Sequence, residues 1–481
     1  PVPRGHRAWP RGTVLSAVLG RAGYRAGSRR GADPVDNAAM SIVVIGEGAL
    51  AGRACRQLTS EGHTVNHLRG AGDKELAVAL GEAVTAVAVL LHEDTAAIRY
   101  VLAVEHLRPG TRIYVALFDR TAADQLRAVV PEVTIISPAD AALPTLLGSV
   151  MGADVVAVGP ALPENAGAAR TVLRRANGFL QVAGFDVPQE VRRAGVIGRL
   201  QGQFRAHDGN SAILLTGLIG MASIIVIDTA MLMAFKHLGF LTSAMEAVAV
   251  LSTVGPAPDA DEYPWYQVFA IVAMLSAIIF LAVFTAGMVE HLLSGRYVGL
   301  FGRRVMPRSG HVVVVGLGQV GFRLCQELRA LGVAVIALER SEHCRNLQLA
   351  RAINIPVYLG DGSMRRTMQK LRVHRSLAVV AVGSDELDNV AIAITARALA
   401  AGVPVVIRAG THDAIEETAS LFSIGSVVDV DGLTVSAVSD WFAGDHPAFL
   451  ADAGSDIAVV GWNGALLTRP KTVGSECPHV G

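Results

Sequence analysis

The chain has 481 residues, a formal net charge of +0, and 51% hydrophobic against 17% charged residues. This composition, with a mean hydropathy of +0.42, is too apolar for an ordinary soluble protein, and the length is too great for a single domain. The neutral charge argues against a nucleic acid partner, because proteins that bind nucleic acid usually carry a basic face.

Residues 1–39 contain seven arginines and no lysine, and they lack the apolar run of a secretory signal. We expect Met40 to be the natural start and the stretch before it to be disordered or untranslated. A transit-like leader is the alternative interpretation.

From Ser41 the sequence predicts a strand, a glycine turn and a helix, and Gly46, Gly48 and Ala51 match the pattern G-x-G-x-x-G/A. Glycines at these positions permit a tight turn and bring a helix N-terminus close to a pyrophosphate. We therefore expect a Rossmann-like domain over residues 40–150.

The same pattern returns in full near the C-terminal end, at Gly316, Gly318 and Gly321. A shift of 270 residues (316 − 46) aligns the two copies and pairs Arg53 with Arg323. The chain thus contains an internal repeat of a Rossmann unit, with the second copy over residues 310–431.

The two copies differ where a nucleotide would bind. Glu339, at the predicted end of the second strand, can accept hydrogen bonds from ribose hydroxyls, whereas the first copy has Arg69 at the aligned position. Further on, aligning Arg112 with Pro404 raises the shift to 292 (404 − 112), so the first copy lacks about one helix and one strand, around residues 355–363 of the second. We predict that the second copy binds a nucleotide and the first does not; selection of a 2′-phosphate by Arg69 is the alternative.

The segment 151–210 is predicted to be a linker with helical patterns around residues 168–180 and 189–204. The second pattern alternates arginines with apolar residues just before a long apolar run. It fits an interfacial helix on the membrane surface, and equally a short solvated helix.

Two apolar runs, 211–235 and 268–289, are each long enough to cross a bilayer; the 22 residues of the second span about 33 Å as a helix. Arginines flank the outer ends of this pair: Arg192, Arg193, Arg199, Arg205, Arg296, Arg303, Arg304 and Arg308. Because basic residues concentrate on the cytoplasmic side, we predict two spans in the plasma (inner) membrane with both termini cytoplasmic.

A short apolar segment, 243–251, lies between the spans and leads directly into Ser252, Thr253, Val254 and Gly255. Non-helical backbone at membrane depth is tolerated only where it is buried or lines an aqueous cavity, and carbonyls of such a strand can replace the hydration shell of an ion. This region, 211–293 with its pore helix and filter at 243–258, resembles the pore module of two-helix potassium channels. Pro256 and Ala257 depart from the family pattern, which puts potassium selectivity in doubt; a membrane hairpin with a chance Thr-Val-Gly is the alternative.

After the linker 294–309, the second Rossmann unit resembles the regulator of potassium conductance (RCK) domain, also called TrkA-N. The resemblance rests on the glycine pattern, Glu339, the run 360–363 and the run 382–389. It implies NAD(H) or an adenine nucleotide (ATP or ADP) as ligand, with Glu339 near the ribose and Asp361 near the adenine. The predicted binding residues are Gly316, Gly318, Gln319, Val320, Gly321, Glu339, Arg340, Asp361 and Gly362.

Other features are less specific. Residues 432–481 form a C-terminal extension with a strand-like stretch at 456–462. Asp228 within the first run faces a cavity or partner, or reaches the interface; Gly287 serves close packing or gating. The cysteines, which show no metal-ligand spacing and are expected to be reduced in the cytosol, are Cys55, Cys325, Cys344 and Cys477.

The sequence as a whole predicts two α/β Rossmann-like domains flanking an all-α two-helix transmembrane pore module. Two helices per chain cannot enclose a pore, so we expect a homotetramer in membrane lipid that conducts potassium or another cation and is regulated by a nucleotide. No Tyr-x-x-x-Lys pair or zinc ligand set appears, so we expect no enzyme activity. A membrane-anchored nucleotide sensor that does not conduct is the alternative function.

Overall fold

The structure of the chain is a computed structural model. It describes residues 39–81, 83–165, 168–186, 209–252, 264–293, 307, 309–410, 425–472 and 477. The predicted leader, the helical pattern at 189–204 and the filter residues Thr253, Val254 and Gly255 lie outside these ranges.

The first Rossmann-like unit has a parallel sheet in the order β2-β1-β3-β4-β5. Its strands are β1 (Ser41–Ile45), β2 (Thr64–Leu68), β3 (Ala86–Val89), β4 (Arg112–Ala116) and β5 (Val133–Ile136). Its helices are α1 (Ala49–Ser60), α2 (Asp73–Ala79), α3 (Asp94–Leu107), α4 (Arg120–Val129) and α5 (Pro138–Met151). The near-continuous burial of β1 and β3 fits a parallel sheet that is covered by helices on both faces.

The second unit repeats this topology with one strand more, in the parallel order β11-β10-β9-β12-β13-β14. Its strands are β9 (His311–Val315), β10 (Ala334–Glu339), β11 (Val357–Leu359), β12 (Ala378–Ala381), β13 (Val405–Ala409) and β14 (Ser426–Asp429). Its helices are α10 (Gln319–Ala330), α11 (Asn346–Ala352), α12 (Arg365–Lys370), α13 (Glu386–Leu399) and α15 (Val430–Phe442), with a short 3-10 turn η3 (Val373–Arg375). In the described part of the first unit β2 has no neighbour that corresponds to β11, as the growing shift between the copies predicts.

The last helix of each Rossmann-like unit packs on the other unit. Leu146 and Leu147 of α5 belong to a core that contains Val312 and Val314 of β9, and Val438 of α15 belongs to a core that contains residues of β1. Since each unit buries a helix of the other, the two units share their hydrophobic cores.

The aligned residues Arg53 and Arg323 hold the two exchanged helices, α15 and α5, each of which packs on the opposite unit. Arg53 on α1 donates from Nη1 to both carboxylate oxygens of Asp429, at 2.8 and 3.0 Å, and Asp429 caps the N-terminus of α15. Arg323 on α10 lies 2.8 Å from Asp140, in the first turn of α5, and donates to the carbonyl of Phe118 at 2.7 Å. The repeat thus extends to the two buried arginines, each of which holds the start of the exchanged helix.

Two small antiparallel sheets follow the Rossmann-like units. One contains β6 (Val155–Gly159), β7 (Arg170–Ala176) and β8 (Phe179–Phe185), with a 3-10 turn η1 (Pro163–Asn165); the other contains β15 (Phe449–Asp452), β16 (Asp456–Val460) and β17 (Leu466–Pro470). Leu173 of the first sheet and Ala451 and Val460 of the second share one core.

The prediction of a helix around residues 168–180 is therefore wrong. Asn177 and Gly178 both have positive φ, 50° and 82°, and join β7 to β8 as a two-residue hairpin turn. Such a turn matches the right-handed twist of paired strands, and Asn-Gly is its usual sequence. The described part of this predicted linker is a sheet with a partner sheet to cover it.

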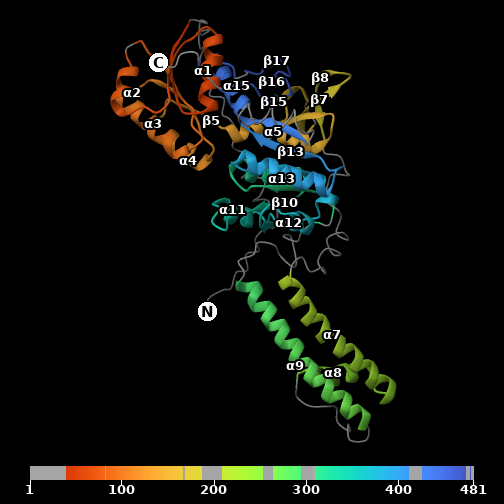
Figure 1. The fold of residues 1–481 in the computed structure, drawn as a ribbon. Coiled ribbons are helices and arrows are strands. Elements are labelled where there is room, and N and C mark those ends of the chain that lie inside the picture. Colours follow the sequence, from red (N-terminus) through yellow and green to blue (C-terminus); the bar gives the residue numbers. More distant parts are fainter. Residues whose placement is uncertain are drawn as a thin grey trace, which may run out of the picture. The chain divides into compact units, whose positions relative to one another are not determined.

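In the sequence, the two Rossmann-like units are separated by two long apolar helices, α7 (Gly209–Phe235) and α9 (Pro264–Leu293). These helices pack on each other and on the short helix α8 (Phe240–Leu251) (Figure 1). The candidate membrane spans are 216–235 and 264–289, with mean hydropathies of 2.1 and 2.8. Only 22% and 17% of these windows are buried, unlike core helices of a soluble protein, so their apolar side chains are available to lipid or to neighbouring chains.

Helices α7 and α9 extend beyond the predicted spans 211–235 and 268–289. One acidic residue and two glycines within them have defined surroundings. Asp228 is fully buried and accepts a hydrogen bond from the Tyr266 hydroxyl on α9 at 3.1 Å, so it contacts a partner rather than the interface. A Cβ on Gly217 would lie 2.7 Å from the backbone nitrogen of Phe284, which brings α7 and α9 into close contact. Gly287 is buried within α9, which continues to Leu293.

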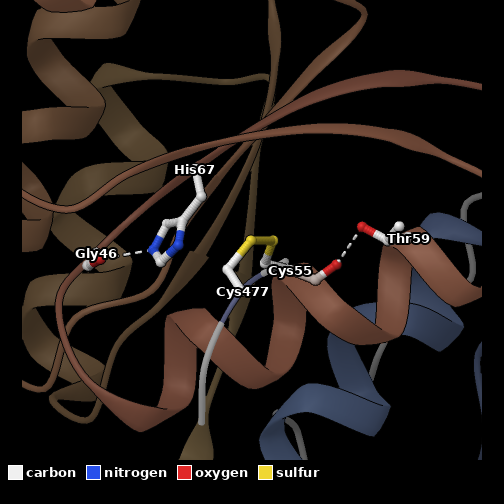
Figure 2. Close-up of a disulfide and its surroundings, with 5 residues drawn as sticks. All are labelled: Gly46, Cys55, Thr59, His67 and Cys477. Carbon is white, nitrogen blue, oxygen red and sulfur yellow. Dashed lines mark hydrogen bonds between the residues drawn. A yellow bond between two sulfur atoms is a disulfide. The ribbon is translucent and has the colours of Figure 1, made fainter. Parts of the chain in front are cut away.

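Cys55 and Cys477 form a disulfide across 422 residues of sequence (Figure 2), contrary to the expectation of four reduced thiols. The separation explains why no spacing pattern reveals the pair: the tail returns to α1 only in the folded chain. Cys325 and Cys344 are free.

Candidate nucleotide-binding cleft

The glycine loop of the second unit connects β9 to α10 and requires glycine at two positions. Gly316 has φ +94°, and a Cβ there would lie 2.9 Å from the backbone nitrogen of Gly383. A Cβ on Gly321 would lie 1.9 Å from the Gly316 carbonyl oxygen, so any side chain would push α10 off the loop. α10 begins after Gly318, which provides no side-chain cap, and the first N–H groups of the helix are therefore free to bind an anion.

Glu339 ends β10 and lies across this loop. Its Oε2 accepts a hydrogen bond from the Leu317 N–H at 2.7 Å, and its Oε1 accepts one from the Ser341 N–H at 2.9 Å. Asn346, which is 4% exposed, holds the other side of the loop by donating from Nδ2 to the Leu317 carbonyl at 3.0 Å. The loop and the carboxylate are thus fixed relative to each other.

Arg340 connects the ends of three strands of the sheet. Its Nη2 lies 3.1 Å from Asp388 and 3.7 Å from Asp361. Asp361 also accepts hydrogen bonds from the hydroxyl and the N–H of Ser363, which lower the pKa of its carboxyl. Arg340 is 58% exposed, so its guanidinium can turn toward a phosphate without losing a buried contact.

A cleft of about 770 Å³ opens at the carboxyl ends of the strands of this sheet, a size typical of a small-molecule site. It brings together most of the predicted binding residues, namely Gly316, Gly318, Gln319, Val320, Glu339, Arg340 and Gly362. Gly321 and Asp361 do not line it: Gly321 packs against the loop, and Asp361 acts through Arg340 and the Ser363 turn. Of the predicted ion-filter residues only Ser252, the C-cap of α8, lies within the described residues, and it does not line this cleft.

The sequence interpretation missed that the first unit also lines the cleft. His92, Asp94 and Phe118 follow β3 and β4 of the first sheet, and all three face the cleft. Asp94 accepts hydrogen bonds from the N–H groups of Phe118 and Asp119 at 2.9 and 2.8 Å, which fixes the loop after β4. The only available signal was their position at carboxyl ends of predicted parallel strands, where ligands bind in such sheets.

Two contacts between the units involve residues that line the cleft, namely His92, Phe118 and Arg408. His92 Nε2 lies 3.2 Å from Oδ1 of the buried Asp431, and this hydrogen bond raises the pKa of His92. The guanidinium of Arg408 lies 5.5 Å from the centroid of the Phe118 ring, in cation–π range. Burial lowers the pKa of Arg408, whose guanidinium nevertheless stays charged at neutral pH.

Comparison with known proteins finds a family match within the second Rossmann-like unit. The family model of the TrkA-N domain matches residues 312–428. Potassium channel protein 1 of Methanocaldococcus jannaschii is 23% identical over 205 residues, which cover 40% of this chain and 60% of the relative, somewhat less than two thirds of its length.

Two solved structures of the GsuK channel cover most of the chain at low identity. The channel bound to NAD is 14% identical with a TM-score of 0.43, covering 89% of this chain and 67% of that one. GsuK bound to ADP is 11% identical with a TM-score of 0.41, covering 89% and 74%.

Proposed function

We propose that this chain, which contains a TrkA-N domain and is distantly related to a potassium channel, is a subunit of a cation channel regulated by a nucleotide in the cleft of its second Rossmann-like unit. The permeant ion is potassium by resemblance, and the ligand is NAD(H) or an adenine nucleotide. The proposal assigns binding and regulation to the cleft rather than catalysis.

One observation carries the pore: α8 is a short apolar helix packed against both long helices, and its last residue, Leu251, is separated from Thr253-Val254-Gly255 only by the C-cap residue Ser252. Its 12 residues span about 18 Å, too short to cross a bilayer. A half-helix of this kind directs the negative end of its dipole toward the residues that follow it in the sequence, where it favours a cation.

Buried polar atoms around α8 support an assembly of several chains. Asp228 Oδ2 and Thr229 Oγ1 on α7, and Ser243 Oγ and Glu246 Oε2 on α8, are buried without a hydrogen-bond partner among the described residues. In a membrane, such groups need partners from ordered water or a neighbouring chain. A ring of four chains around a central pore, with lipid on its outer surface, would supply both.

The cleft supports the regulatory part of the proposal. The uncapped N-terminus of α10 suits a pyrophosphate, and Glu339 at the end of β10 suits ribose hydroxyls. Both Rossmann-like units line the cleft, so a bound nucleotide can prefer one arrangement of the two units over another. With both termini cytoplasmic, the cleft would face the cytosolic nucleotide pool.

Ion flux from purified protein in liposomes tests the proposal. We expect potassium flux that exceeds sodium flux, that changes on addition of NADH or ATP, and that the substitution Gly255→Asp abolishes. Protein that binds nucleotide but gives no flux under any of these conditions would contradict the channel and favour a membrane-anchored sensor.

A further inference from the structure

Three potential metal ligands meet in the buried core of the first Rossmann-like unit (Figure 2). Cys55 lies on α1, His67 on β2 and Cys477 in the C-terminal tail, and they are 0%, 8% and 6% exposed. One ligand atom from each residue lies within 4.8 Å of those of the other two. The chain brings them together from positions that are far apart in sequence, so no local motif reveals the cluster.

The hydrogen bonding of His67 prepares one ring nitrogen for a ligand. Nε2 lies 3.0 Å from the Gly46 carbonyl oxygen, and because a carbonyl only accepts, Nε2 carries the proton. Nδ1 therefore has a free lone pair, and this buried atom has no hydrogen-bond partner among the described residues.

This geometry is the usual arrangement of a metal-binding histidine. Its second nitrogen donates to a backbone carbonyl, which fixes both the tautomer and the ring orientation. In Figure 2 the nitrogen that is not bonded to Gly46 lies on the side of the ring that faces the two sulfurs. An apolar core residue would fill the same place without leaving a buried acceptor unpaired.

The second unit provides an internal comparison. Ala337 on β10 pairs with Val314 as His67 pairs with Val44, and both residues are 270 positions beyond their counterparts. Cys325, the counterpart of Cys55, is a buried free thiol. The fold therefore does not require a histidine at this position, and the three-ligand cluster is a property of the first unit alone among the described residues.

We infer that Cys55, Cys477 and Nδ1 of His67 form a binding site for a thiophilic divalent ion of the zinc class when the two cysteines are reduced. Zinc sites combine thiolate and imidazole ligands, with bonds of about 2.3 Å to sulfur and about 2.0 Å to nitrogen, which places tetrahedral ligand atoms roughly 3.5–3.8 Å apart. A cluster that already lies within 4.8 Å needs only a small adjustment to reach this geometry. Water or an external thiol completes the fourth position.

The disulfide and the metal site exclude each other, because both use the same sulfurs. An external dithiol reduces the pair by giving two electrons and two protons to the S–S bond, and it becomes a disulfide itself. The ion then displaces the two thiol protons into solvent, and Nδ1 contributes its lone pair without a proton change. In either state the tail at Cys477 is fastened to α1 beside the glycine loop that carries Gly46.

Cobalt binding to the full chain in detergent tests this site. After anaerobic reduction with a dithiol and its removal, we expect one Co²⁺ per chain, a thiolate-to-cobalt charge-transfer band and tetrahedral d–d absorption, with zinc displacing the cobalt. The oxidised chain should bind no ion. Reduction should also raise the number of thiols that can be alkylated in unfolded protein from the two of Cys325 and Cys344 to all four.

Matched variants separate the site from other cysteines and histidines. Cys55→Ser and Cys477→Ser should abolish the charge-transfer band, and His67→Ala should weaken cobalt binding by more than the ~10–100-fold that loss of an outer-shell partner costs. Two control variants, Cys344→Ser and His63→Ala, should leave the charge-transfer band and the affinity for cobalt unchanged; His63 lies four residues before His67. Gel filtration and circular dichroism identify variants that fail to fold.

Three results would overturn the inference. The first is a reduced, folded chain that takes up no stoichiometric cobalt or zinc. The second is binding that survives in folded Cys477→Ser or is unaffected by His67→Ala. The third is a folded chain in which the disulfide resists reduction altogether. None of these measurements depends on ion conduction or on the cleft of the second unit.

Discussion

Removing the positive charge of Arg53 should release α15 from the first Rossmann-like unit. Arg53 and Asp429 have side chains that are 1% and 4% exposed, and Asp429 also accepts the Gly432 N–H at 2.8 Å as the cap of α15. Arg53→Met keeps most of the side-chain volume but leaves a buried carboxylate without its cation. Breaking a buried pair in this way costs about 3–5 kcal/mol.

Amide hydrogen exchange in the full chain measures this cost locally. We expect the amides of α15 to exchange at least ~100-fold faster in Arg53→Met, because a factor of ten corresponds to about 1.4 kcal/mol. Arg53→Met combined with Asp429→Asn should cost less than the sum of the single variants by about 1–3 kcal/mol, since no unpaired charge then remains.

The matched control is Arg127→Met, which breaks the exposed pair between Arg127 and Asp124 and should cost less than about 1 kcal/mol. If Arg53→Met accelerates exchange no more than this control does, or if the two changes at Arg53 and Asp429 are additive, the buried pair does not hold the exchanged helix.

Three further predictions concern the cleft, the core and the membrane helices. Phe118→Ala removes a first-unit wall of the cleft and should weaken nucleotide binding, which titration calorimetry measures; unchanged affinity would place the ligand on the second unit alone. Burial lowers the pKa of His311 to about 4, so unfolding takes up a proton and stability should fall by about 3 kcal/mol as pH drops from 6.5 to 4. His311→Phe should flatten that pH dependence, and a wild-type unfolding free energy that does not vary over this range would contradict the assignment. Tyr266→Phe leaves Asp228 without its hydrogen bond and should lower the unfolding free energy of the protein, obtained from thermal denaturation in detergent, by about 1–3 kcal/mol. Tyr358→Phe in the second unit should change this free energy little.

The repeated Rossmann units could be predicted from the sequence because their signals are local. Apolar strands followed by glycines at fixed spacing require that turn, and the change of shift between the copies located the missing strand. Glu339 was identifiable for the same reason, since its position follows from the motif and the length of one strand and helix. The two long helices could be predicted because a run of about 20 predominantly apolar residues is typical of a membrane-spanning helix.

The features that were missed depend on contacts between distant segments. The disulfide joins Cys55 to a residue 422 positions away, and the first-unit wall of the cleft arises only when the two units share helices. The hairpin of β7 and β8 is different, because its signal was local: Asn177-Gly178 is a strong turn sequence, but the arginines at 174 and 175 break the alternation that marks a strand. The second small sheet covers its buried face; of this sheet the sequence predicted only the stretch 456–462, which corresponds to β16 (Asp456–Val460), and not its pairing or its contact with β7.

The central claim is that a nucleotide in the second-unit cleft gates the pore, and flux through liposomes as a function of nucleotide concentration tests it most directly. Glu339→Gln removes the charge proposed to accept hydrogen bonds from the ribose, and hydrogen bonds to charged groups are worth about 1.5–3 kcal/mol. We predict that this variant keeps the flux measured without nucleotide and shifts the NADH or ATP response to ~10–100-fold higher concentration. Flux that responds at the same nucleotide concentration in wild type and Glu339→Gln would contradict gating through this cleft.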